Sequence, residues 1–517
     1  MQLNWTVNEH EGVALLEEET HISVCLDNEI IEKAEAVLKI QPSEKMFFNG
    51  YQTWTWCPEY TKDDVMPRIK LSNSIVRKYG FDRYGDYHFA KYSRRKGVFH
   101  GYSYCYFRDG ENYKLFASLN EDPGYTVFNY DSKKAELVIS RDAEGLRVNG
   151  EYNVLDLYYA EGSEQTVFDG WFAKLGVKPR TLEQLAGYSS WYNHYEEISQ
   201  KTIEEDLEGC SKILKEGDLF QIDDGWEPTV GNWLEEDHDK FPCGMKYLTD
   251  KIHDRGYKAG LWLAPLVATA KSTIWKEHPD WFLLHEGEPW SNGSNWGGFY
   301  SLDLDKKEVR DHLRRVFTRV FDEWGFDLVK LDFLYAGAVF GDERKTRAAK
   351  MHEQMQFIRE LCGDKLILGC GVPLMPAFGL VDYCRIGCDV GLDWDGDAGM
   401  QLAHLERVST RHSIDNTVFR RQLNRRAFLN DPDVFFLRDD NISLTDAEKD
   451  YLANVNSLFG GILLTSDNPG NYDEEKLDSY NYFRKLSQVS NATLKDDRIC
   501  YEVNGTSYSF PFRRPEE

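Results

Sequence analysis

Carboxylates that directly follow short apolar runs are the residues of this sequence best suited to chemistry. Asp332 follows the run FDLVKL, and Asp389 follows the run VDYCRIGC. Cleavage of a glycosidic bond needs two carboxyl groups flanking the sugar, one as nucleophile and one as acid/base. Lys330 points to the same side of its strand as Asp332, and its ammonium favours the ionised carboxylate of a nucleophile. Asp332 therefore suits the nucleophile, and Asp389, which lies beyond Arg385, is the candidate for the second carboxyl group.

Other strand-like runs also end in polar residues. Apolar runs precede Cys370, the pair Asp223-Asp224 and the segment NDPD at 430–433. A single Asp at such a position usually caps the next helix, and a Lys two residues before an Asp makes an ordinary structural ion pair. Five polar strand ends are harder to explain in this way, so we favour a site. Carboxyl groups about 5–5.5 Å apart would give a covalent intermediate and retention, and groups about 6.5–9.5 Å apart would give inversion.

The elements that would position these residues alternate short apolar runs with amphipathic helical stretches, as βαβ units do. Helical periodicity is clear at 249–255 and 306–324. The strand-like runs are AGYSSW (186–191), DLFQIDD (218–224), YKAGLWLAP (257–265), FDLVKLDF (326–333), KLILGCG (365–371), VDYCRIGCD (381–389), RAFLNDPD (426–433) and FGGILLTSD (459–467). These eight runs predict a (β/α)8 TIM barrel, in which function lies at the carboxyl ends of the strands. A doubly wound sheet is the alternative, but it would normally carry a Gly-rich phosphate loop, and the sequence has none.

The predicted fold is multidomain. Before the barrel, short alternating segments are separated by turn signals such as Asp109-Gly110, the pattern of an antiparallel β-sandwich. We predict a β-sandwich domain at 1–180, the catalytic barrel at 181–488 and a short C-terminal β segment at 489–517.

Composition and charge restrict the partners. The formal net charge is −26, which argues against nucleic acid and anionic membranes. No apolar run is long enough to span a bilayer, and the first residues lack the basic and apolar regions of a secretory signal. The ten cysteines form no CxxC pair and are expected to be reduced, so we predict a cytoplasmic protein. The oligomeric state is left open, a homo-oligomer included.

A small-molecule carbohydrate is the expected partner, with neither metal nor cofactor. A metal-dependent hydrolase would need a His-x-His pair or HExxH, and none of the 13 histidines stands two residues from another. Aromatic residues make up 14% of the chain, and their flat apolar faces suit the C–H faces of sugar rings. An aromatic-rich core would explain this number equally well.

Longer segments resemble glycoside hydrolase family 36, the melibiase-type α-galactosidases. The stretch 218–265 has the spacing KFP–G–K–L–DKIH–GYKAGLW, and HPDW (278–281), LVKLDF (328–333), CRIGCDVGLDW (384–394) and LNDPD (429–433) follow in the expected order. The resemblance covers about residues 185–470. It implies a β-sandwich upstream of a catalytic barrel.

By this resemblance the protein hydrolyses terminal α-linked galactose through a covalent galactosyl-enzyme, with Asp332 and Asp389 in the catalytic places. Asp223 and Asp224 would hold the axial 4-OH and the 6-OH, so that glucose would leave buried carboxylates unpaired. The other implied contacts are Lys330 and Arg385 near the 2-OH and 3-OH, the wall residues Trp54, Trp191, Trp226, Trp262 and Trp394, and Cys370 on the floor.

Departures from the family pattern leave the sugar open. The fifth strand ends in CGVPL (370–374) rather than Cys-Ser-x-Gly-Gly, near the sugar's C2, so N-acetylgalactosamine is an alternative. β-L-Arabinopyranose, transfer to a sugar acceptor as in raffinose synthases, and a catalytically silent sugar-binding barrel are others. The sandwich is short and the C-terminal β-domain nearly missing. The motif NGYQTWTW (49–56) resembles a sandwich segment that leans over the barrel mouth of the same or a neighbouring subunit, although Trp54 in a sandwich core is the alternative.

Overall fold

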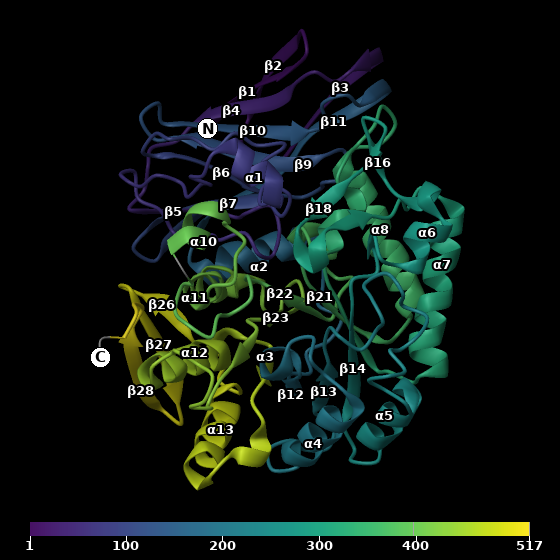
Figure 1. Ribbon diagram of the computed structural model, residues 1–517. Helices are drawn as coiled ribbons and strands as arrows, with labels where there is room; N and C mark the ends of the chain where they lie inside the picture. The colour runs from purple at the N-terminus through teal and green to yellow at the C-terminus, as the bar shows by residue number, and fades with distance from the viewer. Residues whose placement is uncertain (397, 516–517) are drawn as a thin grey trace.

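The N-terminal part of the protein is a sandwich of two antiparallel sheets, coloured purple to blue in the upper part of Figure 1. The computed structural model describes residues 1–396 and 398–515. One sheet has the order β2-β1-β4-β10-β9-β6 and the other the order β3-β11-β8-β7-β5. The strands are β1 (Gln2–Val7), β2 (His10–Leu15), β3 (Glu19–Ile30), β4 (Ala34–Lys39), β5 (Lys45–Phe48), β6 (Val98–Tyr102), β7 (Tyr104–Asp109), β8 (Asn112–Ser118), β9 (Tyr125–Asp131), β10 (Glu136–Asp142) and β11 (Arg147–Gly162).

The alternation of side chains along these strands produces the sandwich. In β10, buried residues alternate with partly exposed ones along the whole strand, because successive side chains of a strand point to opposite faces. The buried faces of the two sheets meet in one apolar core, which includes Leu3, Leu26, Phe107 and Phe128.

The central part is a parallel barrel with the strand order β23-β22-β21-β20-β14-β13-β12-β25-β24. Its strands are β12 (Leu185–Ser189), β13 (Leu219–Ile222), β14 (Lys258–Leu263), β20 (Leu328–Leu331), β21 (Leu366–Gly369), β22 (Tyr383–Arg385), β23 (Leu429–Asp431), β24 (Val434–Phe435) and β25 (Ile462–Thr465). Each of the eight predicted runs overlaps one strand, and β24 is a short addition. The ring closes because only Pro432 and Asp433 separate β23 from β24, which pairs with β25. Asp433 has a left-handed backbone (φ 76°) that turns the chain there.

Helices surround the barrel, as Figure 1 shows for α4, α5, α7 and α8. In α5 the buried residues include Met245, Leu248 and Ile252, a spacing that places them on one face. The helices predicted at 249–255 and 306–324 correspond to α5 and to α7, which continues as a π-helix at Arg319–Glu323. The α-helices are α1 (Asn73–Tyr79), α2 (Glu164–Leu175), α3 (Trp191–His194), α4 (Gln200–Cys210), α5 (Gly244–His253), α6 (Thr273–Glu277), α7 (Lys307–Thr318), α8 (Arg347–Cys362), α9 (Leu374–Ala377), α10 (Ala398–Ala403), α11 (Thr410–Phe419), α12 (Asp446–Phe459) and α13 (Glu474–Leu486).

The connection between β14 and α7 carries two accessory sheets and reaches the sandwich. Its strands are β15 (Val267–Thr269), β16 (Leu284–His285), β17 (Glu288–Pro289), β18 (Ser291–Gly293) and β19 (Phe299–Ser301). A single 3-10 turn, η2 (Asn295–Gly297), follows β18. Tyr84 of the sandwich part donates a hydrogen bond to the side chain of Asn295 in this turn.

Arg420 follows α11 and joins the sandwich to the barrel. Its side chain is fully buried. The guanidinium donates to the backbone oxygens of Thr53 at 2.6 Å and Ile386 at 2.7 Å, and to the side-chain oxygen of Asn49 at 3.0 Å. Asn49 and Thr53 belong to the sandwich part and Ile386 follows barrel strand β22, so one side chain ties the two together.

A three-stranded antiparallel sheet lies near the C-terminus, drawn yellow in Figure 1. It consists of β26 (Thr493–Lys495), β27 (Arg498–Val503) and β28 (Thr506–Pro511). The sandwich strands end at Gly162 and the barrel strands begin at Leu185, so the division at 180/181 falls in a connection. That the three parts are separate folding units remains a proposal. None of the described helices combines the length and hydropathy that a bilayer crossing requires.

Candidate active site

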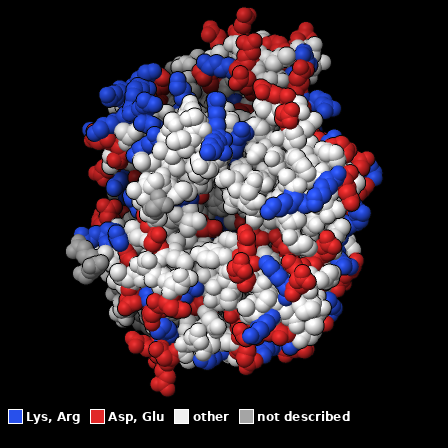
Figure 2. All heavy atoms as spheres, in the orientation of Figure 1, with Lys and Arg blue, Asp and Glu red and all other residues white. Residues whose placement is uncertain are grey.

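A cavity of about 680 Å³ opens where the carboxyl ends of the barrel strands meet the sandwich. Figure 2 shows the surface hollowed near the centre of this face, with acidic side chains at the edge of the hollow. Of the twelve residues predicted for the site, eight line this cavity: Trp54, Trp191, Asp223, Asp224, Trp262, Lys330, Asp332 and Asp389. The other four are placed behind or beside it.

Asp332 follows β20 and is 8% exposed. Its carboxylate accepts hydrogen bonds from the indole of Trp262 at 3.1 Å and from the backbone N–H of Phe333 at 2.9 Å. Burial raises the pKa of Asp332 above its usual value, Lys330 lowers it, and the charge of Asp389 raises it further. The expectation that Lys330 keeps Asp332 ionised is therefore right in direction but outweighed by burial.

Lys330 makes its direct ion pair with Asp223 and not with Asp332. Its ammonium donates to Asp223 Oδ2 at 2.9 Å, and the side-chain amide of Gln221 donates to the same atom at 2.8 Å. Asp224 accepts a hydrogen bond from the indole of Trp296 at 2.9 Å. Burial and the neighbouring carboxyl of Glu227 raise the pKa of Asp224 well above its usual value. The Asp223-Asp224 pair thus offers polar acceptors to a ligand in the cavity.

Asp389 is held by Arg385, whose guanidinium lies behind the cavity and does not line it. Arg385 donates to Asp389 at 2.6 Å, to Asp431 at 3.1 Å and to Asp433 at 3.0 Å. Asp433 also accepts from Tyr192, at 2.5 Å. Burial raises the pKa of Asp433 to about 6, although Arg385 lowers it. Arg385 thus orients Asp389, and its predicted contact with the sugar near the 2-OH and 3-OH stays a prediction.

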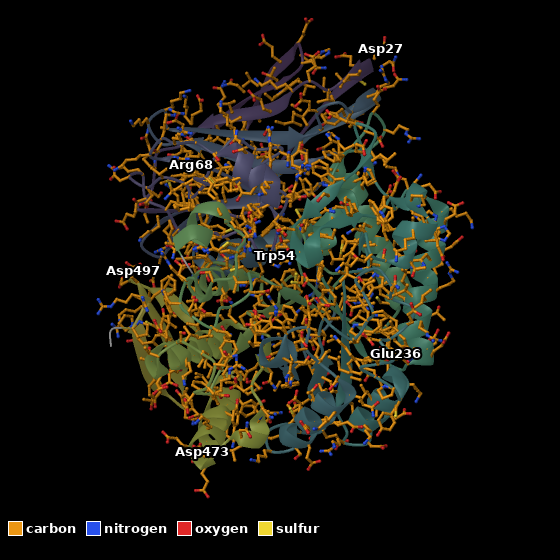
Figure 3. The ribbon with its side chains drawn as sticks, viewed as in Figure 1. Asp27, Trp54, Arg68, Glu236, Asp473 and Asp497 are labelled. Atoms are coloured by element: carbon orange, nitrogen blue, oxygen red, sulfur yellow. The ribbon has the colours of Figure 1, made fainter. Side chains whose placement is uncertain are left out.

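Trp54 reaches the cavity from the sandwich part and lies at the centre of the molecule in Figure 3. Its indole donates to Cys370 Sγ at 3.3 Å. Gly371 (φ 58°) permits this approach, since a Cβ there would lie 2.8 Å from the Trp54 ring. The geometry therefore places Trp54 over the barrel mouth of its own chain rather than in the sandwich core.

Cys370, Trp226 and Trp394 do not line the cavity. The thiol of Cys370 is fully buried beneath Trp54. Trp226 is also fully buried and donates to the backbone oxygen of Trp262 at 2.9 Å, so it supports the wall from behind. Trp394 packs near Tyr451 and Arg514, on the side of the C-terminal sheet.

Three further cavity residues, Trp296, Tyr84 and Glu406, carried no signal in the sequence. They come from connections whose position depends on how the sandwich packs on the barrel. Asp431 and Asp433 had a signal, since they belong to the NDPD segment at a strand end, but no role was assigned to them. Within the described residues, no group of three or more His, Cys, Asp or Glu is arranged to hold a metal ion.

Glu406 is a buried acid in the wall of the cavity, and its pKa is raised. It accepts hydrogen bonds from the hydroxyl of Tyr87 at 3.2 Å, and burial, followed by the charge of Asp86, raises its pKa from 4.5 to about 8. A raised pKa means that the folded protein keeps a proton that the unfolded chain loses above pH 4.5. This contribution to stability is therefore lost as the pH rises towards 8.

Between pH 5 and pH 8, the free energy of unfolding of the unsubstituted protein should fall by more than that of the Glu406→Gln variant. We expect the two decreases to differ by about 2–4 kcal/mol. Urea unfolding of both proteins at pH 5, 6.5 and 8 measures the difference. Other buried acids, such as Glu121 with a pKa of about 7, act in both proteins and cancel. Parallel stability curves would show that Glu406 ionises normally.

Comparison with known proteins agrees with the geometry. The family model Melibiase matches residues 188–361. The α-galactosidase Mel36A of Lactobacillus acidophilus is 28% identical over 151 residues, which are 28% of this chain and 20% of that protein. The matched segment thus spans about a fifth of that relative's length.

Solved structures extend the similarity to the whole fold. The α-galactosidase TtGalA of Thermus thermophilus, solved with p-nitrophenyl α-D-galactopyranoside, has a TM-score of 0.77 at 26% identity, covering 94% of this chain and 98% of that one. The GH36 α-galactosidase AgaA of Geobacillus stearothermophilus has a TM-score of 0.59 at 12% identity, covering 90% and 66%, and supports the fold alone. The Melibiase match, the TtGalA similarity along the chain and the carboxylates gathered at the barrel mouth together support a relationship to glycoside hydrolase family 36, the melibiase-type α-galactosidases.

Proposed function

We propose that the protein is a retaining α-galactosidase that releases terminal α-linked galactose from galactosides. The observation that carries the proposal is one cavity lined by Asp332 and Asp389 together with the acceptor pair Asp223-Asp224. The first two supply the nucleophile and the acid/base that glycosidic cleavage needs. The pair supplies the recognition of the sugar. The names of Mel36A, of α-galactosidase 1 of Pediococcus pentosaceus and of TtGalA support the same substrate class.

The proposed reaction runs in two displacements. A carboxylate oxygen of Asp332 attacks C1 while the bond from C1 to the leaving oxygen breaks, and Asp389 gives that oxygen its proton. Water then attacks C1 of the galactosyl-enzyme, Asp389 takes a proton from the water, and the bond to Asp332 breaks. The hydrogen bonds from Trp262 and Phe333 fix the Asp332 carboxylate for attack. Arg385 does the same for Asp389.

Selection of galactose follows from the buried acceptors. Asp223 and Asp224 are 2% and 4% exposed, so a sugar that cannot reach them leaves carboxylates in the cavity without the hydroxyl partners they would otherwise have. An axial 4-OH would reach this pair from a galactose ring, whereas the equatorial 4-OH of glucose points elsewhere. Trp54, Trp191 and Trp262 supply apolar faces around the ring.

Three p-nitrophenyl glycosides test the proposal: the α-D-galactopyranoside, the N-acetyl-α-D-galactosaminide and the β-L-arabinopyranoside. We expect the highest kcat/KM for the galactoside. Proton NMR during hydrolysis of the galactoside should show α-galactose as the first product, before mutarotation. β-Galactose as the first product would overturn the retaining mechanism, and a preference for one of the other glycosides would overturn the substrate.

A reducing, cytoplasmic location is part of the same proposal. All ten cysteines are free thiols, seven of them buried. Disulfides are common in secreted proteins and rare in the cytosol, where thiols are kept reduced. Labelling of the unfolded protein with a thiol reagent, with and without prior reduction, should count ten free thiols in both cases.

A further inference from the structure

Trp296 brings a remote part of the chain to the sugar-binding carboxylates. It lies in η2, in the connection between β14 and α7, and lines the cavity. Its indole N–H donates to Asp224 Oδ2 at 2.9 Å. Its ring lies 5.0 Å from that of Phe333 and 6.0 Å from that of Trp262, measured between centroids. Trp296 therefore both fixes the Asp224 carboxyl and closes the cavity beside it.

The backbone of Trp296 is left-handed (φ 54°), which is unfavourable for a bulky residue and persists only where the surroundings impose it. The sandwich part provides those surroundings through Tyr84. The Tyr84 hydroxyl accepts from the backbone N–H of Ser294 at 3.1 Å and donates to the side chain of Asn295. Gly293 (φ 146°) lets the tyrosine approach, since a Cβ there would lie 2.3 Å from the hydroxyl. Tyr84 thus fixes the backbone conformation of the segment 293–296.

The two acceptors of the carboxylate pair are not equivalent. Asp223 is held on the barrel floor by Lys330 and Gln221. Asp224 is one residue further from the strand and faces the segment from the accessory connection. The hydroxymethyl group is the substituent that projects furthest from a galactose ring, so it is the one that suits the outer acceptor.

We propose that Trp296 is a specificity-determining residue that holds Asp224 for the C6 hydroxymethyl group of the sugar, and that Tyr84 of the sandwich positions Trp296 for this task. The inference rests on the proposed function. It makes the sandwich, rather than the barrel alone, responsible for choosing between a hexose and the pentose that lacks C6.

p-Nitrophenyl α-D-galactopyranoside and p-nitrophenyl β-L-arabinopyranoside test this directly, because they differ only in the C6 group. The Trp296→Phe variant keeps a ring but loses the N–H. We expect its kcat/KM for the galactoside to fall about tenfold, the effect of losing one buried hydrogen bond. The value for the arabinopyranoside should change less than about twofold, because that sugar lacks the C6 hydroxymethyl group that the proposal assigns to Asp224. Inhibition by free galactose and free L-arabinose gives the same comparison if turnover of the pentoside is slow.

Two further variants separate this role from a structural one. Tyr84→Phe should shift the galactoside-to-arabinopyranoside ratio in the same direction by a smaller factor. Trp275→Phe makes the same chemical change in α6, where Trp275 packs on Phe282 and Tyr300, and should leave the ratio unchanged. Equal losses on both glycosides in Trp296→Phe and Tyr84→Phe, or no loss on the galactoside, would overturn the inference. Failure of the proposed function looks different, since the unsubstituted protein would then hydrolyse neither glycoside or would itself prefer the arabinopyranoside.

Discussion

The Asp332→Gly variant should show a kcat on p-nitrophenyl α-galactoside lowered by about 10⁴-fold or more, because the covalent step loses its nucleophile. Sodium azide should restore release of nitrophenol, since the small anion fits the space left by the carboxylate. Azide then attacks C1 opposite the leaving group, so the product should be β-galactosyl azide. Nitrophenol release gives the rates, and NMR gives the anomeric configuration of the product.

Asp332→Asn is the matched control, because the amide keeps the shape of the side chain and leaves no room for azide. It should be as inactive as the glycine variant and should not be rescued. Thermal unfolding of both variants checks that the fold is intact. Full activity in either variant would remove Asp332 from the reaction, and formation of the α-azide would assign it the other catalytic role.

Replacement of Asp389 by glycine should affect substrates according to their leaving groups. A disaccharide such as melibiose needs a proton on the departing oxygen, so its kcat/KM should fall by about 10²–10⁴-fold, the usual contribution of general acid catalysis. Nitrophenolate leaves without a proton, so the first step on the aryl galactoside should be affected far less. Azide should again accelerate turnover, but by attacking the galactosyl-enzyme, and the product should be α-galactosyl azide.

The opposite anomers of the two azide products distinguish the two carboxylates without reference to rates. Arg385→Lys is a useful companion to Asp389→Gly, because Arg385 orients the Asp389 carboxylate with a 2.6 Å hydrogen bond. It should show a smaller loss with the same dependence on the leaving group. Equal losses on melibiose and the aryl galactoside in Asp389→Gly would contradict the acid/base assignment.

The barrel was predictable because its strands are short apolar runs whose polar residues collect at one end. The lengths of the strands were less predictable than their positions. The run 381–389 contains only the three-residue strand β22 (Tyr383–Arg385). The residues after it leave the sheet, and this departure brings Asp389 to the cavity. A run of apolar letters does not reveal where pairing stops, because the strand and the turn after it are both buried.

The site was predictable where it follows strands and unpredictable where it follows tertiary packing. Asp223, Asp332 and Asp389 are one or a few residues beyond a strand, so the fold alone brings them together. Trp296 and Glu406 come from long connections, and only the packing of the sandwich on the barrel decides that they face the cavity. Trp226 shows the opposite error, since an aromatic residue next to an acidic pair can equally well point into the core.

The guanidinium of Arg420 has a consequence for how the molecule can be cut or recombined. Its donors are satisfied by acceptors from two parts of the chain, so a barrel released near residue 181 would keep a positive charge in its interior with most of its acceptors gone. Exchange of the N-terminal part between relatives would have to match the side chain at position 49 to Arg420, because Asn49 accepts from it through its side-chain oxygen. The sandwich in this sense completes the interior of the barrel domain, because it supplies acceptors that a charge buried there requires.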